Sequence, residues 1–295
     1  MSILPPLNID ELVVDCNRLV SETSGYKSTD ASSLNLPDLT TDDYADEQMQ
    51  LNERKALDFV LPHIRTCEAK KVLDVGCGIG KMVTTLSAEG YDAYGVDLSG
   101  LQNRWKRLKQ PESNFFVVGP EELKLPFCDN SLDFAFSLGV IEHVGTVDGH
   151  ADRSTNFHEI RRQWTQEIFR TIAPGGHMLL AGPNRAFPID VAHGLDSKAH
   201  AIERTLSHWV GASVHKTWGD NFLWGYPDFH RYLSGHAYSL TPLSVANYLH
   251  HSRVPRSLRV LVKAYVDYLP QALLGTAFNP WTAVLVSKLP SSEAL

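Results

Sequence analysis

The chain has 295 residues, a formal net charge of −7 and a hydrophobic content of 43%, which is ordinary for a globular protein. Its length fits one large domain or a core domain with an insertion. The acidic charge argues against a nucleic-acid-binding surface, because neutralising phosphates takes clustered Lys and Arg. Four cysteines without C-x-x-C spacing predict a reducing, cytoplasmic compartment with neither disulfides nor zinc, and we assign no metal ligands.

The N-terminal part of the chain shows no signal-peptide pattern, and no stretch approaches the ~18 uncharged apolar residues needed to span a bilayer. Apolar side chains at helical spacing over 8–20 predict an amphipathic helix, and the polar stretch 21–43 predicts a linker or lid. We therefore expect residues 1–43 to form an N-terminal helix and a mobile lid segment. A second helix is predicted from Asp46 to Pro62, with buried positions Leu51, Ala56, Leu57 and Val60.

The centre of the sequence is the apolar run Val72–Val75, which predicts a buried strand. Glycines at alternate positions follow, and residues 82–89 then predict a helix. A strand, a glycine turn and a helix form the first unit of a doubly wound α/β sheet. The glycines let the backbone approach a ligand, and the helix N-terminus offers unpaired N–H groups. Asp97 ends a second apolar strand, where Rossmann-like folds place an acid on ribose hydroxyls.

The glycine pattern excludes two common phosphate-binding motifs. A dinucleotide motif would need glycine in place of Lys81, and a P-loop would need glycine at Val75 and a hydroxyl at Met82. Residues 74–80 instead resemble motif I of the class I S-adenosylmethionine (SAM) methyltransferases, (D/E)-x-G-x-G-x-G, at every position. The stretches 119–144 and 173–176 are similar to further segments of this family, and the chain resembles its type 11-like members.

This resemblance implies a three-layer α/β sandwich around a seven-stranded, doubly wound sheet in the order 3-2-1-4-5-7-6, with strand 7 antiparallel. Residues 44–185 would form the SAM-binding Rossmann-like core, 186–240 a mainly helical substrate cap inserted after strand 5, and 241–295 the completion of the core. Thr241 and Pro242 predict the start of a helix over 243–250. Helical spacing over 258–269 predicts another helix, although the sixth strand of the family is expected nearby.

The resemblance further implies that SAM binds across strands one, two and four, with S-adenosylhomocysteine as the product. The expected cofactor-binding residues of the core are Asp74, Gly76, Cys77, Gly78, Gly80, Asp97, Leu98, Glu121, Ser137 and Leu138. Glu121 is included because Gly119 and Pro120 occupy the position of the usual adenine-binding acid, and Pro120 has no N–H. Tyr44 and Arg54 are candidates for the methionine carboxylate; the alternative is a packed aromatic ring and a solvent-facing arginine.

The insertion after strand five is rich in aromatic residues and contains six histidines. These residues predict a substrate pocket, or alternatively a small satellite core. A base is needed only when the acceptor must lose a proton, as a hydroxyl does. The candidates are His193, near Asp190, and His230, near Asp228; His143 is either a third candidate or part of the pocket wall.

Three functional hypotheses follow. The first is a SAM-dependent methyltransferase acting on a small, fairly apolar acceptor, such as a natural product or a lipid or isoprenoid precursor, with O-methylation favoured and no nucleic-acid partner. The second is a protein or RNA methyltransferase. The third is a SAM-binding protein whose cap performs other chemistry, such as cyclisation or regulation.

Overall fold

The computed structural model describes residues 42–97, 105, 112–118, 124–146, 152–249, 254 and 256–290, with the backbone alone for 42–48 and 112. The helix predicted over 8–20 and nearly all of the polar segment 21–43 lie outside the described residues. Among the helices of the described part, none is both long and apolar enough to cross a membrane.

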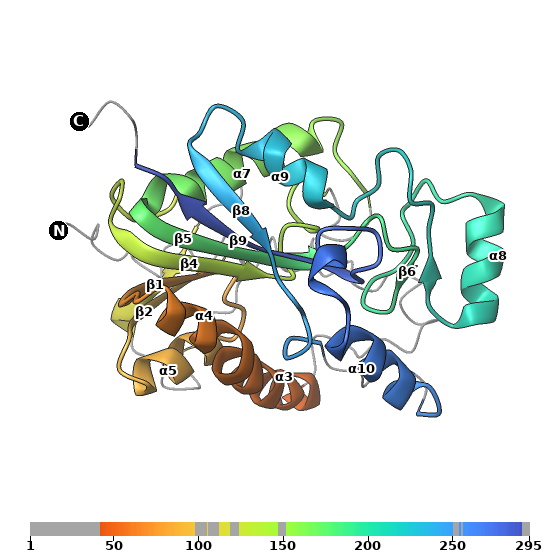
Figure 1. The fold of residues 1–295 in the computed structure, drawn as a ribbon, viewed down its shortest axis with the longest axis horizontal. Coiled ribbons are helices and arrows are strands. Elements are labelled where there is room, and N and C mark those ends of the chain that lie inside the picture. The colour runs from red at the N-terminus through yellow and green to blue at the C-terminus, as the bar shows by residue number, and fades with distance from the viewer. Residues whose placement is uncertain are drawn as a thin grey trace.

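A seven-stranded sheet forms the centre of the molecule, in the order β3-β2-β1-β4-β5-β9-β8 (Figure 1). Strand β9 runs antiparallel to both of its neighbours, whereas β3, β2, β1, β4 and β5 pair in parallel. The topology predicted from the resemblance is therefore confirmed. The strands are β1 Lys71–Val75, β2 Asp92–Asp97, β3 Phe115–Val117, β4 Leu132–Leu138, β5 Ile172–Pro183, β8 Tyr238–Pro242 and β9 Trp281–Lys288.

Helices cover both faces of this sheet. Helices α7 and α9 lie on one face, and α3, α4, α5 and α10 lie on the other (Figure 1). The central strands are apolar throughout because successive side chains enter different cores: Val72 packs with the second group of helices, and Leu73 packs with α7. The helices are α3 Asp42–Lys55, continued by the π-turn Ala56–Val60 and by α4 Leu61–Thr66, then α5 Lys81–Ala88, α7 Phe157–Thr171, α8 Ala201–Val210, α9 Tyr226–Tyr232 and α10 Arg259–Asp267; short 3₁₀ turns span Glu112–Asn114 and Gln271–Leu273.

Two local predictions were wrong. Residues 238–242 form the edge strand β8, so Thr241 does not cap a helix over 243–250. Pairing with β9 overrides the local helix-start signal, and Pro242 is tolerated because it ends an edge strand. Strand β8 is the sixth strand of the predicted order, and the helix predicted over 258–269 is present as α10. Leu57, predicted to be buried, is 37% exposed.

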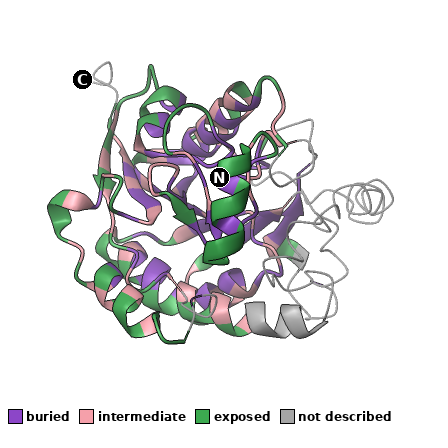
Figure 2. Ribbon diagram, turned by 90° about the vertical axis from the view of Figure 1, so that its right-hand side faces the viewer, coloured by how far each residue is buried: buried purple, intermediate pink, exposed green. Residues whose placement is uncertain are grey.

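The insertion after β5 has two parts. One part projects from the sheet: strands β6 Ile189–Asp190 and β7 Ser213–Val214 form a two-stranded ribbon, and α8 lies between them in the chain. Figure 2 shows α8 in front with a largely exposed surface, which includes Ile202, Leu206, Trp209 and Val210. The other part belongs to the main core, because α9 contacts α7 and Trp224, Phe229 and Tyr232 are wholly buried there.

Candidate functional site

The glycine turn between β1 and α5 contains three glycines with positive φ, but they differ in what surrounds them. A Cβ on Gly76 would lie 2.4 Å from Val140 Cγ2, and one on Gly80 would lie 2.4 Å from Phe115 Cε1. A Cβ on Gly78 would meet no atom of the described residues within 4 Å. Packing therefore requires glycine at positions 76 and 80, whereas Gly78 faces open space that a ligand can occupy.

Asp97, at the end of β2, is held against this turn. Its Oδ2 accepts the Gly78 N–H at 2.7 Å, and Trp105 Nε1 donates to the Gly78 carbonyl at 2.7 Å. Trp105 is buried and its ring packs on Phe115. Both backbone polar groups of Gly78 are thus fixed, and the Asp97 carboxylate lies beside the open space. This is the arrangement expected of a residue that accepts ribose hydroxyls.

Two predicted cofactor residues point into the protein. Cys77 is buried in the core, and burial, together with Asp97 and Asp74, raises the pKa of its thiol well above the ordinary value. The Ser137 hydroxyl is also buried and donates to the Val75 carbonyl at 2.5 Å, which ties β4 to β1. Both side chains support the site rather than face a ligand. Leu138 is half-buried at the end of β4.

Asp74 is a buried carboxyl group whose Oδ2 has no hydrogen-bond partner within the described part of the chain. Burial and, secondarily, the nearby Asp97 raise its pKa well above the ordinary value. An unpaired buried acceptor is costly unless a ligand supplies a donor. The open space at Gly78, the fixed carboxylate of Asp97 and this acceptor fit SAM, which carries an ammonium group and ribose hydroxyls.

Of the remaining predicted cofactor residues, the structure describes only the side chain of Arg54. Leu98, Glu121 and the side chain of Tyr44 lie outside what the structure describes. Arg54 is exposed on α3. Its neighbour Glu53 pairs with Lys81, the first residue of α5, at 3.1 Å, so α3 reaches the glycine turn through that ion pair.

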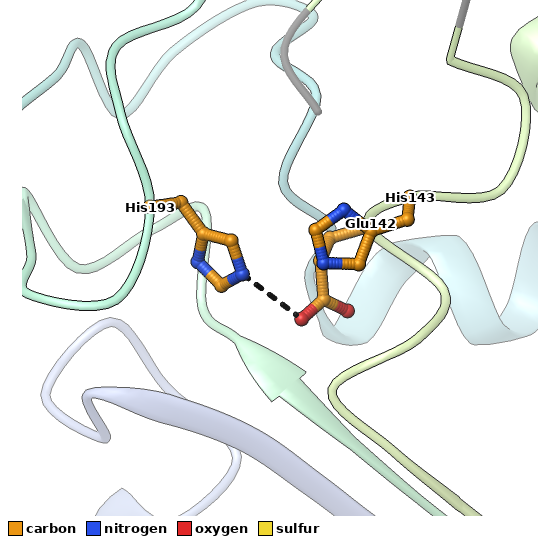
Figure 3. Close-up of side chains that lie close together, drawn as sticks. All are labelled: Glu142, His143 and His193. Carbon is orange, nitrogen blue, oxygen red and sulfur yellow. Dashed lines mark ion pairs between the residues drawn. The ribbon is translucent and has the colours of Figure 1, made fainter. Parts of the chain in front are cut away.

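A second constellation lies just after β4, where Glu142 and His143 meet His193 from the insertion (Figure 3). One potential ligand atom of each residue lies within 4.8 Å of those of the other two. His193 Nε2 is 3.5 Å from Glu142 Oε1, and the rings of His143 and His193 are 5.2 Å apart. We call Glu142, His143 and His193 the site cluster.

Asp190 supports His193 from within the insertion. The His193 Nδ1 lies 2.8 Å from Asp190 Oδ2, so the structure brings together the acid and the histidine that the sequence suggested as partners. Asp190 Oδ1 also accepts the Ala192 N–H at 2.7 Å. Burial alone would raise the pKa of Asp190, but the His193 imidazole and these hydrogen bonds lower it overall.

Glu142 is the least satisfied member of the site cluster. It is wholly buried, and neither carboxyl oxygen has a hydrogen-bond partner within the described residues. Burial raises its pKa, although His193 acts in the opposite direction. A Cβ on Gly182 of β5 would lie 2.9 Å from Glu142 Oε2 and 2.4 Å from Trp224 Nε1, so glycine is required there for the carboxyl group and the indole to fit.

Arg161 of α7 holds the backbone around the site cluster. Its wholly buried guanidinium donates from Nε to the Val144 carbonyl at 2.9 Å and from Nη2 to the carbonyls of Glu142 at 2.9 Å and Phe222 at 2.5 Å. Burial lowers the pKa of this guanidinium. Arg161 therefore joins the loop after β4 to the insertion. Neither Glu142 nor Arg161 was predicted; the available signals were an acid within an apolar run and an arginine on the inward face of an amphipathic helix.

The site cluster lies next to the glycine turn. Val140, two residues before Glu142, packs against Gly76, as the close approach of its methyl groups shows. Tyr248 lies on the same side: burial and the nearby Glu142 raise its pKa, and the Lys55 ammonium lies 4.6 Å from its ring centroid. The two constellations thus share the carboxyl edge of β1 and β4, where open α/β sheets bind ligands.

His230 lies away from the site cluster, beside the edge strand β8. Its exposed ring contacts the Tyr238 hydroxyl at 2.7 Å and not Asp228, so the suggested Asp228–His230 pair is not formed. Asp228 is buried and accepts the Gly225 N–H at 2.9 Å while pairing with Arg185 at 3.3 Å. His230 lines a surface pocket of about 410 Å³ beside the edge strand β8, with β4, β5 and β9 between that strand and β1.

Comparison with known proteins finds similarity to methyltransferases. Residues 73–180 match the family model described as a methyltransferase domain. A probable tocopherol O-methyltransferase of Oryza sativa is 27% identical over 47% of this chain and 36% of its own length. The tRNA U34 carboxymethyltransferase of Tolumonas auensis is 37% identical over 29% of this chain and 28% of its own length.

Among solved structures, the methyltransferase domain of a bacterial protein, CtHen1-C, aligns over 81% of this chain and all of its own, with a TM-score of 0.46 and 18% identity. The chain spans about a third of the length of the two curated relatives described above. Residues 73–180 thus match a methyltransferase domain, and the sheet has the strand order expected of the class I SAM-dependent methyltransferases, whose cofactor is SAM.

Proposed function

We propose that this protein transfers the methyl group of SAM to a hydroxyl group of a small, fairly apolar acceptor. The observation that carries the proposal is the position of the site cluster beside the glycine turn, where Val140 packs against Gly76. SAM supplies an electrophilic methyl group and its own leaving group, so the protein has to align the acceptor and exclude water. A hydroxyl acceptor must also lose a proton, and the site cluster contains groups that accept one.

For the cofactor, we propose that Asp97 binds the ribose and that Gly78 allows the backbone to approach it. We also propose that Asp74 accepts a hydrogen bond from SAM, because its Oδ2 is buried and has no hydrogen-bond partner among the described residues. Leu98 and Glu121 remain the proposed contacts of the adenosine part, and Tyr44 and Arg54 those of the methionine carboxylate.

For the acceptor, we propose that residues 186–240 form the cap. His193, oriented by Asp190, is the proposed base, with Glu142 and His143 beside it. The burial of Glu142 and His193 supports this role, since a dry site strengthens electrostatic interactions. The exposed apolar side chains of α8, among them Ile202 and Trp209, support an apolar acceptor, as does the O-methyltransferase named above. The absence of C-x-x-C spacing among the four cysteines of the sequence supports a reducing compartment, and we propose the cytoplasm.

A second candidate is transfer to a tRNA acceptor, which the name of the Tolumonas auensis relative, a tRNA U34 carboxymethyltransferase, favours. The net charge of −7 argues against it, because RNA binding relies on clustered positive charge. In the test, the protein is incubated with SAM and either a panel of apolar phenols or tRNA, and the S-adenosylhomocysteine formed is measured. We expect turnover on a phenol and none on tRNA. Turnover on tRNA alone would refute the proposed acceptor class, and SAM binding without turnover on any acceptor would favour regulation or other chemistry.

The role of the site cluster is tested with His193→Gln. We expect the rate of methyl transfer to fall about 100-fold or more, as for the loss of a general base, while SAM affinity stays the same. His208→Gln is the matched control, because His208 is an exposed histidine of the same insertion. Equal rates in the two variants would remove His193 from the reaction.

A further inference from the structure

The composition of the site cluster is unusual for an acid–base site alone. It combines two imidazoles and one carboxylate, which is the donor set of catalytic zinc sites and of non-haem iron sites with open positions. The ligand atoms converge within 4.8 Å although they come from two distant segments of the chain. No metal ligands were predicted from the sequence, because local sequence patterns do not join Glu142 and His143 to the distant His193.

The distance between His193 and Glu142 fits a shared cation. Two ligand atoms held at about 2.1 Å from one tetrahedral ion are about 3.4 Å apart. The separation between His193 Nε2 and Glu142 Oε1 is 3.5 Å. A direct hydrogen bond between an imidazolium and a carboxylate would be shorter, at about 2.7–2.9 Å.

Asp190 supplies the supporting contact that metal-binding histidines show. Its carboxylate accepts Nδ1–H of His193, which turns Nε2 toward Glu142 (Figure 3). Metal-ligating histidines almost always donate their other ring N–H to a carboxylate or carbonyl, which fixes the tautomer and the ring orientation. Asp190 is itself fixed by the Ala192 N–H, so the ring is oriented without any ion present.

Glu142 provides the second, independent observation. It is wholly buried, and neither of its oxygens has a hydrogen-bond partner in the part of the chain that the structure describes. Buried carboxylates are paired with cations or coordinate metals. The nearby guanidinium of Arg161 donates to the backbone carbonyls of residues 142, 144 and 222 rather than to this carboxylate.

We propose that Glu142, His143 and His193 bind one divalent transition-metal ion of the Zn²⁺ type, with Asp190 as a positioning residue. The role of the ion rests on the proposed function: at an open coordination position it would attract the acceptor oxygen and favour loss of its proton to water. The O–CH₃ bond then forms as the S–CH₃ bond breaks, and S-adenosylhomocysteine leaves with the electron pair of that bond. In this form of the site, His193 acts as a ligand and not as the base.

The experiment uses untagged full-length protein freed of metal with a chelator. Binding of Co²⁺ is followed by visible absorption, and binding of Zn²⁺ by calorimetry. We expect about one ion per chain in the wild type, at least about tenfold weaker binding in Glu142→Gln and His193→Gln, and about 10- to 100-fold weaker binding in Asp190→Asn. His208→Gln, which removes an exposed imidazole of the insertion, is expected to bind as the wild type does.

Absence of binding in folded wild-type protein would overturn the metal site, as would equal affinities of the wild type, Glu142→Gln and His193→Gln. Circular dichroism and SAM affinity of the metal-free variants verify that each is folded. SAM binding by the metal-free wild type tests the proposed function separately. Loss of the metal site with SAM binding intact refutes only the inference, whereas metal binding without SAM binding refutes only the proposed function.

Discussion

Gly78→Val offers the sharpest test of the glycine turn. The φ of Gly78 is +54°, and a Cβ there would lie more than 4 Å from every atom in the part of the chain that the structure describes. The substitution therefore destabilises the fold mainly through the backbone strain of an L-residue at positive φ, by about 1–2 kcal/mol. Typical domains are stable by about 5–15 kcal/mol, so the variant should remain folded. The new side chain would occupy the space proposed for the cofactor, and we expect affinity for S-adenosylhomocysteine to fall at least about 100-fold, or about 2.7 kcal/mol.

Gly90→Val is the matched control. Gly90 follows the other end of α5 and has a φ of +90°, and an added Cβ would likewise have no described neighbour within 4 Å. The two variants should lose similar stability in urea denaturation, because both place valine at positive φ in open space. Calorimetric titration with S-adenosylhomocysteine should then separate them, with wild-type affinity in Gly90→Val. Equal affinities in the two variants would refute the assignment of the space at Gly78 to the cofactor.

Four further predictions concern other parts of the molecule. Asp97→Ala removes a carboxylate that accepts the Gly78 N–H, and we expect it to weaken SAM binding about 10- to 100-fold. Asp97→Glu should weaken SAM binding less. Calorimetry measures the affinities of both variants, and unchanged affinity in Asp97→Ala would contradict the role of Asp97 in SAM binding. Arg161→Leu leaves three buried carbonyls without their hydrogen-bond donor and should lower the free energy of unfolding by about 3 kcal/mol or more. The control is Arg162→Leu, at a half-exposed arginine, which should lower it by about 0.5 kcal/mol or less. Urea denaturation measures both free energies. Burial lowers the pKa of His63 and of His177, so the unfolded state binds more protons than the folded state below the ordinary histidine pKa of 6.5. The free energy of unfolding should therefore fall as the pH drops from about 6.5 toward the lowered pKa values. His177→Gln should reduce this dependence of the free energy of unfolding on pH. Trp209→Ser on α8 should raise KM for the apolar acceptor without changing SAM affinity, and an unchanged KM would place the acceptor away from α8.

The glycine turn and its flanking elements were predictable because their signals are local. An apolar run bounded by lysines, alternating glycines and a helical pattern specify β1, the turn and α5 within twenty residues or so, and the resemblance supplied the strand order. Edge strand β8 was missed because Thr241 and Pro242 carry a helix-start signal. The strand exists through its pairing with β9, and that contact is not visible in the local sequence.

The site cluster could be predicted only in part. Asp190 and His193 are close in sequence, so their pairing was a local expectation. The meeting of His193 with Glu142 depends on how the insertion folds back over β4, and Arg161 and Phe222 fix that arrangement through a contact between distant segments. A deletion that removes much of the cap, such as one of residues 196–226, would disturb the fold because Phe222 and Trp224 are buried. Point substitutions are therefore the cleaner test of the cap.

The proposed reaction is methyl transfer to a small, apolar hydroxyl compound. The most direct measurement incubates the purified protein with SAM carrying a labelled methyl group and a fractionated cell extract. Incorporated label is then counted in the small-molecule, RNA and protein fractions. We predict that label enters an apolar small molecule as a methyl ether, and that Gly78→Val abolishes this while Gly90→Val does not. Label in RNA or protein, or no label at all from protein shown to bind SAM, would contradict the claim.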